Sequence, residues 1–576
     1  MTRAPAAADT ETTVHLLTAA EMRAVDRATA EAGTPVATLM ERAGEGVARC
    51  LAARFGSPLA ARVLVLTGSG HNGGDGFAAA HALAARGARV TVACCAPDDR
   101  LAPAARAMRD RLAGTIVDVT PTPDAESLAR VAARHDHWDL VVDALLGTGA
   151  EGDPRGTIAD ACGLANALRA LGTRVVAVDL PTGVSADDGR ASDDAVRADL
   201  TVTFGDARRG HWLWPGREYT GVLEVVDIGL VEPAAAGLAP ALLATADTLA
   251  SLVPMRDPRA HKGSTGRALL VGGAPGMTGA LVLAARAATR AGAGYVRVAA
   301  PASLQDVLAS HLVEPMVLGC GEDSARTLTT SALDRIRDEA ARADAVALGS
   351  GLTTRPQAAA LTRELTTHLD RPLVLDADAL TALAPAAEVL EPALRLAGAP
   401  RVLTPHLGEM ARLTGQTTAE LEARRIDTAR GWAQRWGVTL VLKGAPTVVA
   451  SPDGSVSVNP CSPACWWHSS RRASPPSTPP ASRCTRTDWP ATSPRARAAP
   501  SAWSPATSSS TSPRRCGWWP RRTDPCDDER PRGVGHRGAV RTTGATSDVS
   551  VEQLGQLRLR AGAHHTLHHL AVLEHH

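Results

Sequence analysis

The stretch that decides the fold is Val63 to Phe77, which reads VLVLTGSGHNGGDGF. Its apolar start predicts a strand, five glycines fall within the nine residues from Gly68 to Gly76, and an alanine-rich helix is expected to begin at Phe77. A strand, a glycine loop and a helix in this order point backbone N–H groups and a helix N-terminus at one place, which suits a phosphate. Glycine also lets the backbone approach a ligand closely. The stretch therefore predicts an anion-binding loop in an α/β sheet, although a tight structural turn would contain the same residues.

Strand-like runs alternate with helical segments on both sides of this loop. In the first half they occupy 62–66, 89–95, 139–144 and 174–180, and in the second half 267–271, 295–299, 343–348, 372–375, 401–404 and 439–442. This alternation is typical of mostly parallel sheets covered by helices on both faces. We therefore predict two α/β domains, at 14–230 and 245–460, and a linker rich in proline and alanine at 231–244.

Length, charge and composition exclude several classes of protein. The chain has 576 residues, too many for one hydrophobic core, and its formal net charge of +1 is spread over interspersed acids and bases, which disfavours a nucleic-acid partner. No apolar run reaches the roughly 18 residues that a membrane-spanning helix needs. The 10 cysteines lack metal-ligand spacing and indicate reduced thiols. We expect a cytoplasmic protein without a membrane or nucleic-acid partner.

The last region, 461–576, differs in kind. Between Cys461 and Gly533, 73 positions contain no Leu, Ile, Val, Met or Phe, and six of the 11 tryptophans lie in this region. A segment so poor in aliphatic residues does not bury enough surface to fold, so a disordered tail is one interpretation. The other is a shifted reading frame in a GC-rich gene, with or without a small deletion. Cys465–His468 can be encoded so that a shift by two bases gives Leu-Val-Ala, and the same shift can turn Thr487–Ser493 into Gly-Leu-Ala-Gly-Asp-Leu-Ala. We favour the shifted frame, and the coding DNA distinguishes the two.

Two further strand ends carry acidic residues. Val141–Gly149 ends a strand with Asp143 and continues into a second glycine loop, and Val178–Gly183 ends another strand with Asp179. In a doubly wound sheet the carboxyl ends of the strands line the ligand crevice, so we expect these loops to meet the first one. Oxygen-bearing residues in such loops also suit a hard cation. Either aspartate alone would serve equally well as a helix cap.

Lysine is almost absent from the chain. The two lysines, Lys262 and Lys443, lie in the glycine-bearing turns His261-Lys262-Gly263 and Lys443-Gly444-Ala445, each beside a predicted strand. A lysine that persists where arginine supplies nearly every other positive charge is expected to need a compact ammonium group. Chance survival of two surface lysines is the alternative. We favour two anion-handling loops.

The first half resembles the NAD(P)H-hydrate epimerase family. The matching motifs are Leu17–Met22, Leu39–Gly44, the Asn-Gly-Gly-Asp-Gly loop and Val178–Gly183, and the resemblance covers about residues 14–230. It implies a Rossmann-like doubly wound fold, bound potassium, and interconversion of the two C6 epimers of hydrated NADH and NADPH. His71 and Thr182 stand where the family usually has Asn and Ser, and Thr182 keeps the hydroxyl.

This resemblance assigns roles to individual residues. The hydrate would be bound by His71, Asn72, Gly73, Gly74 and Asp75 in one loop and by Gly147, Thr148, Gly149, Ala150, Glu151, Gly152 and Asp153 in another. Potassium would be held by Asn72, Asp143 and Thr182. Asp179 would bind the substrate and would be the best acid–base candidate, because epimerisation needs proton transfer at a carbinolamine-like carbon.

The second half resembles the ADP-dependent NAD(P)H-hydrate dehydratase family over about residues 245–460. The matching motifs, in order, are His261–Gly263, Gly272-Gly273, Gly279-Ala280, Gly292–Gly294, Gly349–Leu352, Leu375–Leu380, Thr404–Met410 and Lys443–Thr447. The resemblance implies a ribokinase-like fold and ADP as co-substrate. We also expect Mg²⁺ as a cofactor and a homo-oligomer. The hydrate would contact Ala280, Gly351 and His406, and the nucleotide would contact Lys443, Gly444, Ala445, Pro446 and Thr447. A core histidine is the alternative for His406.

One motif of the second family is missing. The family continues after the equivalent of Asn459-Pro460 with a Gly-Ser-Gly-Asp loop, which would supply an anion hole and an activating aspartate for phosphoryl transfer. This chain contains no Gly-Ser-Gly-Asp. We therefore expect epimerase activity and inefficient dehydratase activity. The alternatives are a non-catalytic ligand-binding scaffold for the first domain and a ribokinase-like small-molecule kinase for the second.

Overall fold

The structure is a computed structural model of the whole chain, and it describes residues 14–250, 252–384, 391–392, 394–395 and 397–459. The region 461–576, for which a shifted frame is our hypothesis, lies outside these residues. Within them, alternating strands and helices build two mostly parallel sheets. The predicted α/β class is therefore confirmed.

In the described residues, the first sheet has seven parallel strands in the order β4-β3-β2-β5-β6-β7-β9. The strands are β2 (Arg62–Thr67), β3 (Arg89–Cys94), β4 (Asp118–Pro121), β5 (Leu140–Ala144), β6 (Arg174–Val178), β7 (Leu200–Phe204) and β9 (Val222–Val226). The chain adds β3 and β4 on one side of β2 and the later strands on the other, so the strand order reverses between β2 and β5. Doubly wound sheets bind ligands beyond the carboxyl ends of their strands at such a reversal.

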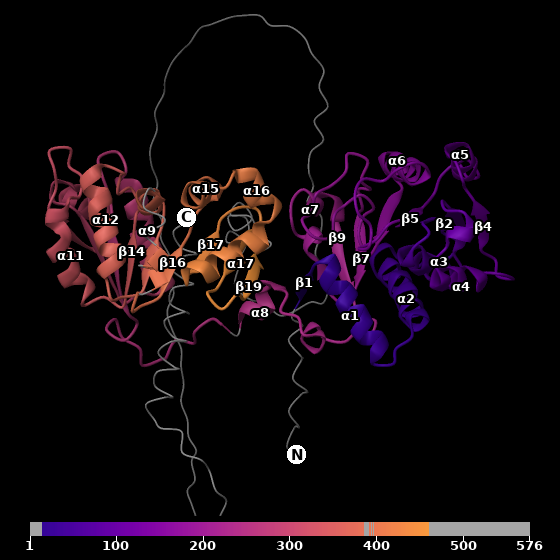
Figure 1. Cartoon of the computed structure of the whole chain (residues 1–576), viewed down its shortest axis with the longest axis horizontal. Coiled ribbons are helices and arrows are strands. Elements are labelled where there is room, and N and C mark those ends of the chain that lie inside the picture. The colour runs from indigo at the N-terminus through magenta and orange to yellow at the C-terminus, as the bar shows by residue number, and fades with distance from the viewer. Residues whose placement is uncertain (1–13, 251, 385–390, 393, 396, 460–576) are drawn as a thin grey trace, which may run out of the picture. The chain divides into compact units, whose positions relative to one another are not determined.

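Helices cover both faces of this sheet (Figure 1). They are α1 (Ala19–Glu31), α2 (Val36–Phe55), α3 (His71–Ala85), α4 (Pro103–Asp110), α5 (Ala125–Ala132), α6 (Thr157–Ala170) and α7 (Gly216–Thr220). Helices α2, α3 and α4 share a core with Val63 and Val65 of β2, whereas α5 and α6 pack against Leu64 and Leu66 on the opposite face. The alternation of β2 side chains between the two cores is what a strand buried on both faces requires.

The second sheet, counted over the described ranges, has 12 strands in the order β13-β12-β11-β14-β15-β16-β17-β18-β19-β10-β1-β8. Their bounds are β1 (His15–Leu17), β8 (Ala207–Arg208), β10 (Ala241–Leu243), β11 (Arg267–Val271), β12 (Tyr295–Pro301), β13 (Met316–Cys320), β14 (Ala345–Leu348), β15 (Leu373–Leu375), β16 (Arg401–Leu403), β17 (Thr439–Leu442), β18 (Thr447–Ala450) and β19 (Val456–Asn459). In this spatial order, the strands from β13 through β12 and β11 to β17 are parallel. Strands β17, β18 and β19 form an antiparallel meander. Strand β10 lies within the stretch expected to be a linker and pairs with both β19 and β1.

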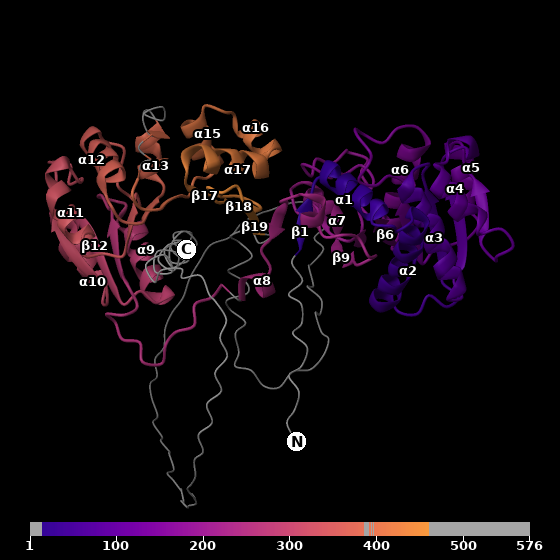
Figure 2. The same ribbon diagram turned by 60° about the horizontal axis from the view of Figure 1, so that its bottom comes forward.

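Helices also lie on both faces of the parallel part of this sheet (Figure 2). They are α9 (Thr278–Ala291), α10 (Gln305–His311), α11 (Leu333–Ala340), α12 (Pro356–His368), α13 (Asp378–Leu383), α15 (Leu407–Thr414), α16 (Thr418–Ala423) and α17 (Arg425–Trp436). The short helix α8 (Ala246–Ala250) follows β10 along the chain. Leu269 of β11 shares a core with α11 and α12, and its neighbour Leu270 shares another with α9 and α10.

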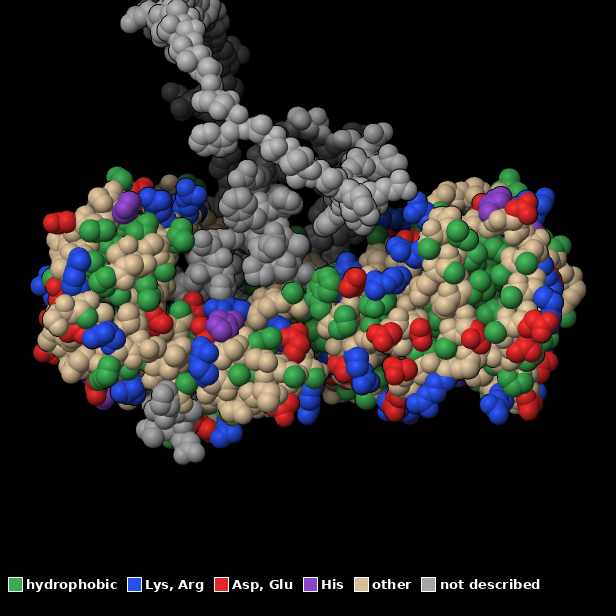
Figure 3. Space-filling view, turned by 90° about the horizontal axis from the view of Figure 1, so that it is seen from above, with side chains coloured by type: hydrophobic (Ala, Val, Ile, Leu, Met, Phe, Trp, Pro, Cys, Tyr) green, Lys and Arg blue, Asp and Glu red, His purple; other side chains and the backbone are tan. Residues whose placement is uncertain are grey.

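Acidic and basic side chains are interspersed over the face of the molecule that Figure 3 shows. In the described ranges, no helix combines the length and apolar character that crossing a bilayer requires. The described cysteines are free thiols, and Cys94, Cys95, Cys162 and Cys320 among them are buried. These observations fit core thiols rather than a disulfide framework.

Helices α2 and α3 approach each other closely at Gly44. A Cβ atom at Gly44 would lie 2.4 Å from the backbone carbon and 2.6 Å from the Cβ of Ala78 in α3. Distances this short mean that the helices must separate to accept any side chain. We conclude that Gly44 sets the spacing between α2 and α3.

Replacing Gly44 with alanine is therefore expected to lower the free energy of unfolding by about 1–3 kcal/mol, the usual cost of overpacking a core. The matched control is Gly163→Ala in the interior of α6, where a Cβ would meet no atom within 4 Å. That variant should gain up to about 1 kcal/mol through helix propensity. Thermal and denaturant unfolding measure both, and equal stability of the two variants would contradict the packing argument.

Candidate functional site

The glycine loop is shorter than the sequence suggested, because α3 begins at His71 rather than at the predicted Phe77. The glycines of its first turn have ordinary helical backbone and serve close packing. A Cβ at Gly73 would lie 2.2 Å from the Gly68 carbonyl oxygen, and one at Gly76 would lie 2.4 Å from the Cβ of Ala144 in β5. The glycines thus bring the N-terminus of α3 against the strand reversal between β2 and β5.

Asn72 lies at the centre of this arrangement. It is 8% exposed, and neither its amide nitrogen nor its amide oxygen has a hydrogen-bond partner. A Cβ at Gly147 would lie 3.1 Å from the Asn72 side-chain carbon and 2.8 Å from Oδ2 of Asp179. The structure therefore brings Asn72, Gly147 and Asp179 together, as predicted, around a space that only a glycine leaves open. A buried amide without a partner at this place leaves both a donor and an acceptor available to a ligand.

Asp143 at the end of β5 is fully buried and bound to Thr182. Its oxygens accept hydrogen bonds from the Thr182 amide at 2.8 Å and hydroxyl at 2.7 Å, and from the Leu145 amide at 3.2 Å. Burial raises the pKa of Asp143 to about 6 against these donors. The Thr182 hydroxyl also accepts from the Leu146 amide at 3.0 Å. Thr182 thus contacts Leu146, and Asn72 lies beside Gly147, the next residue of the same loop.

Asp179, the predicted acid–base residue, is held by four donors. Oδ1 accepts from Nη2 of Arg208 at 3.0 Å and from the Thr203 hydroxyl at 3.2 Å, while Oδ2 accepts from the Thr148 amide at 2.8 Å and hydroxyl at 2.6 Å. Burial alone would raise the pKa of Asp179, but the Arg208 charge and the Thr148 donors outweigh it and lower the pKa. Asp179 also has a left-handed backbone, with φ of 65°.

Three polar residues of this network were not predicted from the sequence: Thr203, Arg208 and His211. Nδ1 of His211 accepts from the Arg208 amide at 2.9 Å and Nε2 donates to the Asp179 carbonyl at 2.8 Å. Burial, helped by the Arg208 charge, lowers the pKa of His211 and keeps it neutral. The sequence signal for Arg208 and His211 was the run Asp206–His211, which contains several polar residues and follows a strand. This run matches no motif.

The rest of the second loop forms the rim of the site. Gly149, Ala150, Glu151, Gly152 and Asp153 are all exposed. The Ala150 amide donates to the Gly147 carbonyl at 3.0 Å, which closes a turn. Of the predicted substrate contacts in this loop, Gly147 and Thr148 therefore lie beside Asp179, and the other five face solvent.

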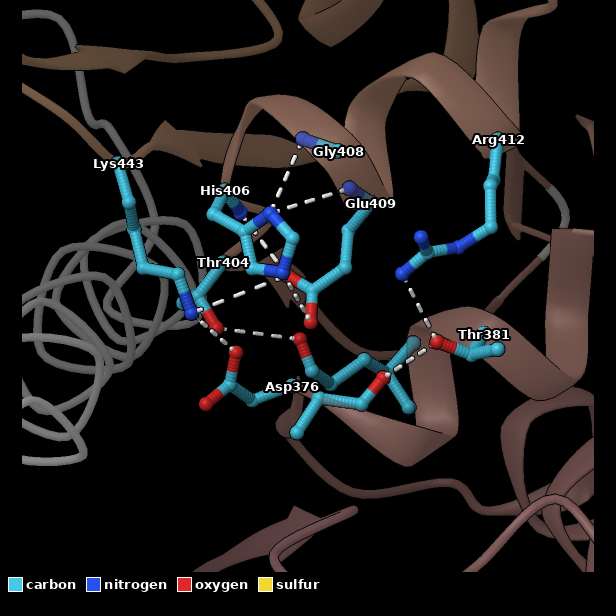
Figure 4. Close-up of polar contacts among 10 residues, drawn as sticks. Asp376, Thr381, Thr404, His406, Gly408, Glu409, Arg412 and Lys443 are labelled. Carbon is cyan, nitrogen blue, oxygen red and sulfur yellow. Dashed lines mark hydrogen bonds and ion pairs between the residues drawn. The ribbon is translucent and has the colours of Figure 1, made fainter.

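In the second domain, His406 and Lys443 lie side by side at the carboxyl ends of β16 and β17 (Figure 4). Nζ of Lys443 donates to Oδ1 of Asp376 at 2.7 Å and lies 3.9 Å from Oε2 of Glu409. Nδ1 of His406 caps α15 by accepting from the Gly408 and Glu409 amides, and 53% of its side chain is exposed. His406 is therefore not a core histidine.

The turn that follows Lys443 is braced by a residue not predicted for the site. Arg425 donates from Nη1 to the carbonyl oxygens of Pro446 at 2.9 Å and Lys443 at 3.3 Å. A Cβ at Gly444 would lie 2.2 Å from the same nitrogen. This bracing fixes the predicted nucleotide loop, Lys443–Thr447.

The remaining predicted contacts of this domain lie near the start of α9. Gly351 has φ of 64°, and a Cβ there would lie 2.8 Å from the Cβ of Met277, which precedes α9. Ala280 is exposed in the first turn of the same helix. Lys262 is exposed elsewhere, with Nζ 5.3 Å from the centre of the Tyr295 ring. Gly351 thus contacts the residue that precedes α9, whereas no described contact joins Lys262 to His406 or Lys443.

Comparison with known proteins assigns each half of the chain to a protein family. A family model described as YjeF-related protein N-terminus matches residues 36–210, and one described as NAD(P)H-hydrate dehydratase matches residues 268–465. The bifunctional NAD(P)H-hydrate repair enzyme of Moorella thermoacetica is 40% identical over 453 residues, which cover 78% of this chain and 84% of that protein. The chain belongs to the family of bifunctional NAD(P)H-hydrate repair enzymes.

Two further proteins show the extent of the similarity. The repair enzyme of Escherichia coli K12 is 34% identical over 424 residues, covering 73% of this chain and 76% of its own length. An ADP/ATP-dependent NAD(P)H-hydrate dehydratase of Bacillus subtilis, crystallised with ATP and Mg²⁺, is 29% identical over 36% of this chain and 68% of that one, with a TM-score of 0.29. The family assignment rests on the full-length relatives.

The buried His211 predicts a pH dependence of stability. Because the folded-state pKa lies below the usual 6.5, the unfolded chain takes up a proton first as the pH falls below that value, so the free energy of unfolding decreases. From pH 6.5 to 5 this loss amounts to about 2 kcal/mol. The difference between wild type and His211→Gln, measured by denaturant unfolding across this range, should show the loss. The control is His81→Gln at an exposed position of α3, and a similar difference curve for both variants would contradict the assignment.

Proposed function

We propose that the first domain interconverts the C6 epimers of hydrated NADH and NADPH. The observation that carries this proposal is the unpartnered Asn72 amide facing Asp179 across Gly147 at the strand reversal, in a chain 40% identical to a full-length repair enzyme. The helix N-terminus at His71 and the Gly147 loop would take the phosphates and ribose of the dinucleotide. The reaction moves a proton at an oxygen-bearing carbon, which calls for a positioned carboxyl group.

Potassium fits the residues present. Asn72, Asp143 and Thr182 offer an amide oxygen, a carboxylate and a hydroxyl, which are the oxygen ligands that a hard cation prefers. In the described residues, no cluster of His, Cys, Asp and Glu offers a transition-metal site instead. When bound, the ion would supply a fixed positive charge for substrate oxygens. Asp143 and the Thr182 hydroxyl already form the buried core of this oxygen set.

For the second domain we propose a hydrate site at Ala280, Gly351 and His406 and a nucleotide site at Lys443, Gly444, Ala445, Pro446 and Thr447. The Lys443 ammonium is supported by the carboxylates of Asp376 and Glu409 and would pair with phosphate oxygens. ADP with Mg²⁺ is the proposed co-substrate, and the ADP/ATP-dependent dehydratase of Bacillus subtilis was itself crystallised with ATP and Mg²⁺. The chain lacks the Gly-Ser-Gly-Asp sequence that would stabilise the transferring phosphoryl group, so its dehydratase step should be slow. We also propose a cytoplasmic homo-oligomer, and the cytoplasmic part of this proposal is supported by the reduced thiols that the cysteine pattern indicates.

The purified chain should interconvert the two epimers of NADH hydrate, followed by chromatography, and should regenerate little NADH from the hydrate when ADP or ATP with Mg²⁺ is added. A repair enzyme that contains the Gly-Ser-Gly-Asp sequence serves as the positive control for the second assay. Absence of interconversion would overturn the first-domain proposal. Regeneration of NADH at the rate of the control enzyme would overturn the argument from the missing loop.

The potassium site is tested by the salt dependence of melting temperature. Potassium at about 100 times its dissociation constant should add about 2.7 kcal/mol of stability to the wild type. Thr182→Ser keeps the hydroxyl and should retain this gain, whereas Thr182→Val removes the hydroxyl and should lose it. For each variant, the melting temperature with potassium is compared with the melting temperature of the same variant in choline chloride. A variant that is less stable at the start is therefore judged only by what potassium adds. A full gain in Thr182→Val would remove Thr182 from the site.

A further inference from the structure

The carboxylate of Asp179 has little capacity to exchange a proton. A carboxylate has about four lone-pair positions, and four donors from Arg208, Thr203 and Thr148 already occupy those of Asp179. Protonation would break at least one of these bonds beside a buried guanidinium, since the Arg208 side chain is only 3% exposed. Asp179 is built to stay ionised. A second group is needed to move the proton.

Asp75 occupies the open side of the first two turns of α3. Viewed down the helix axis, the Cβ direction of each residue is rotated by about 100° from that of the residue before it. Measured from Asn72, the Cβ directions at Gly76, Gly73 and Gly74 are therefore about 40°, 100° and 200°. All three directions are closed, because a Cβ at any of them would meet a neighbouring atom within 3 Å. Asp75 points at about 300°, beside Asn72 in the remaining sector. Its half-buried carboxyl group receives no hydrogen bond from any described residue.

The charges around Asp75 favour its neutral form. Burial raises the pKa of Asp75 well above its usual value, and the negative charges of Asp179 and Asp26 raise it further. Asp26 of α1 has its own pKa raised, first by burial, with Arg208 and His71 opposing. Two carboxyl groups with opposite tendencies, one held ionised and one held neutral, are the usual arrangement when one positions the substrate and the other transfers a proton.

We propose that Asp75 is the catalytic acid–base group of the epimerisation and that Asp179 is a positioning residue. The proposal rests on the epimerase function proposed above. Asp75 is free of partners and shares the open sector of α3 with Asn72, whereas Asp179 is anchored on the far side of Gly147. Both groups thus face the space where the hydrate would lie.

The epimerisation moves one proton from Asp75 to the substrate and back. The Asp75 carboxyl group gives its proton to the C6 hydroxyl of the hydrate, the C6–O bond breaks, and its electron pair leaves with water. The lone pair of N1 forms a C6=N1 double bond, which carries one positive charge next to the ionised Asp179. Water then adds to the opposite face of C6, the double-bond electrons return to N1, and the proton that this water loses passes through solvent water back to Asp75. The other epimer results, and Asp75 ends as it began.

The first test is Asp75→Asn in the full chain, assayed for interconversion of the NADH hydrate epimers. We expect kcat to fall by at least about 100-fold, the usual contribution of a general acid, with KM changed by less than about threefold. Asp75→Glu should recover part of the loss. The control is His81→Gln, an exposed position on the same helix, with unchanged kcat. A raised KM with unchanged kcat in Asp75→Asn would make Asp75 a binding group only and would overturn the proposal.

The second test is the pH profile of kcat between about pH 5 and 9, measured first on the wild type, which needs no variant to fold. Since Asp75 must start protonated, wild-type kcat should fall as the pH rises through the Asp75 pKa. Asp179→Asn should raise KM yet keep this limb. A wild-type kcat that does not change with pH would overturn the inference. So would a fall of kcat with rising pH that disappears in Asp179→Asn and persists in Asp75→Asn. An inactive wild type would instead refute the proposed function itself.

Discussion

The first domain depends on the contact between the start of α3 and the strands β2 and β5, where no side chain fits. Gly73 and Gly76 allow this contact, and Gly44 allows the matching approach of α2 to α3. Because a helix and a sheet this close leave no freedom to rotate, the remaining positions of the first turn have fixed directions. Gly73 and Gly76 thereby fix the directions of Asn72 and Asp75.

Each proposed site contains a buried ion pair at the carboxyl end of a strand. Asp179 pairs with Arg208 after β6, and Asp376 pairs with Lys443 after β15. In both, the backbone at or beside the acid is left-handed, with φ of 65° at Asp179 and 49° at Ala377. Such backbone is costly for a residue with a Cβ and persists only where its surroundings enforce it. In each pair one partner is expected to meet the substrate or nucleotide, so the strain is concentrated where orientation matters most.

Much of this architecture was readable from the sequence. Apolar runs predicted the central strands of both sheets, and the polar strand ends predicted the convergence of Asn72, Gly147 and Asp179, because parallel strands end at one edge. The start of α3 was misjudged, since glycine signals both turns and close packing. Arg208, His211 and Arg425 were missed, because their contacts join residues that the sequence gives no reason to pair. The pairing of β10 was missed for the same reason: a three-residue strand in a Pro/Ala-rich stretch has no periodicity to detect.

The scarcity of lysine has a practical consequence. Of the two ammonium side chains, that of Lys443 is 12% exposed and paired with carboxylates, whereas Lys262 is exposed. Amine-directed chemistry on the native protein thus has a single accessible side-chain target, together with the α-amino group. Crosslinkers, fluorophores or beads coupled in this way would attach in a nearly uniform orientation and leave the ammonium group beside Asp376 unmodified.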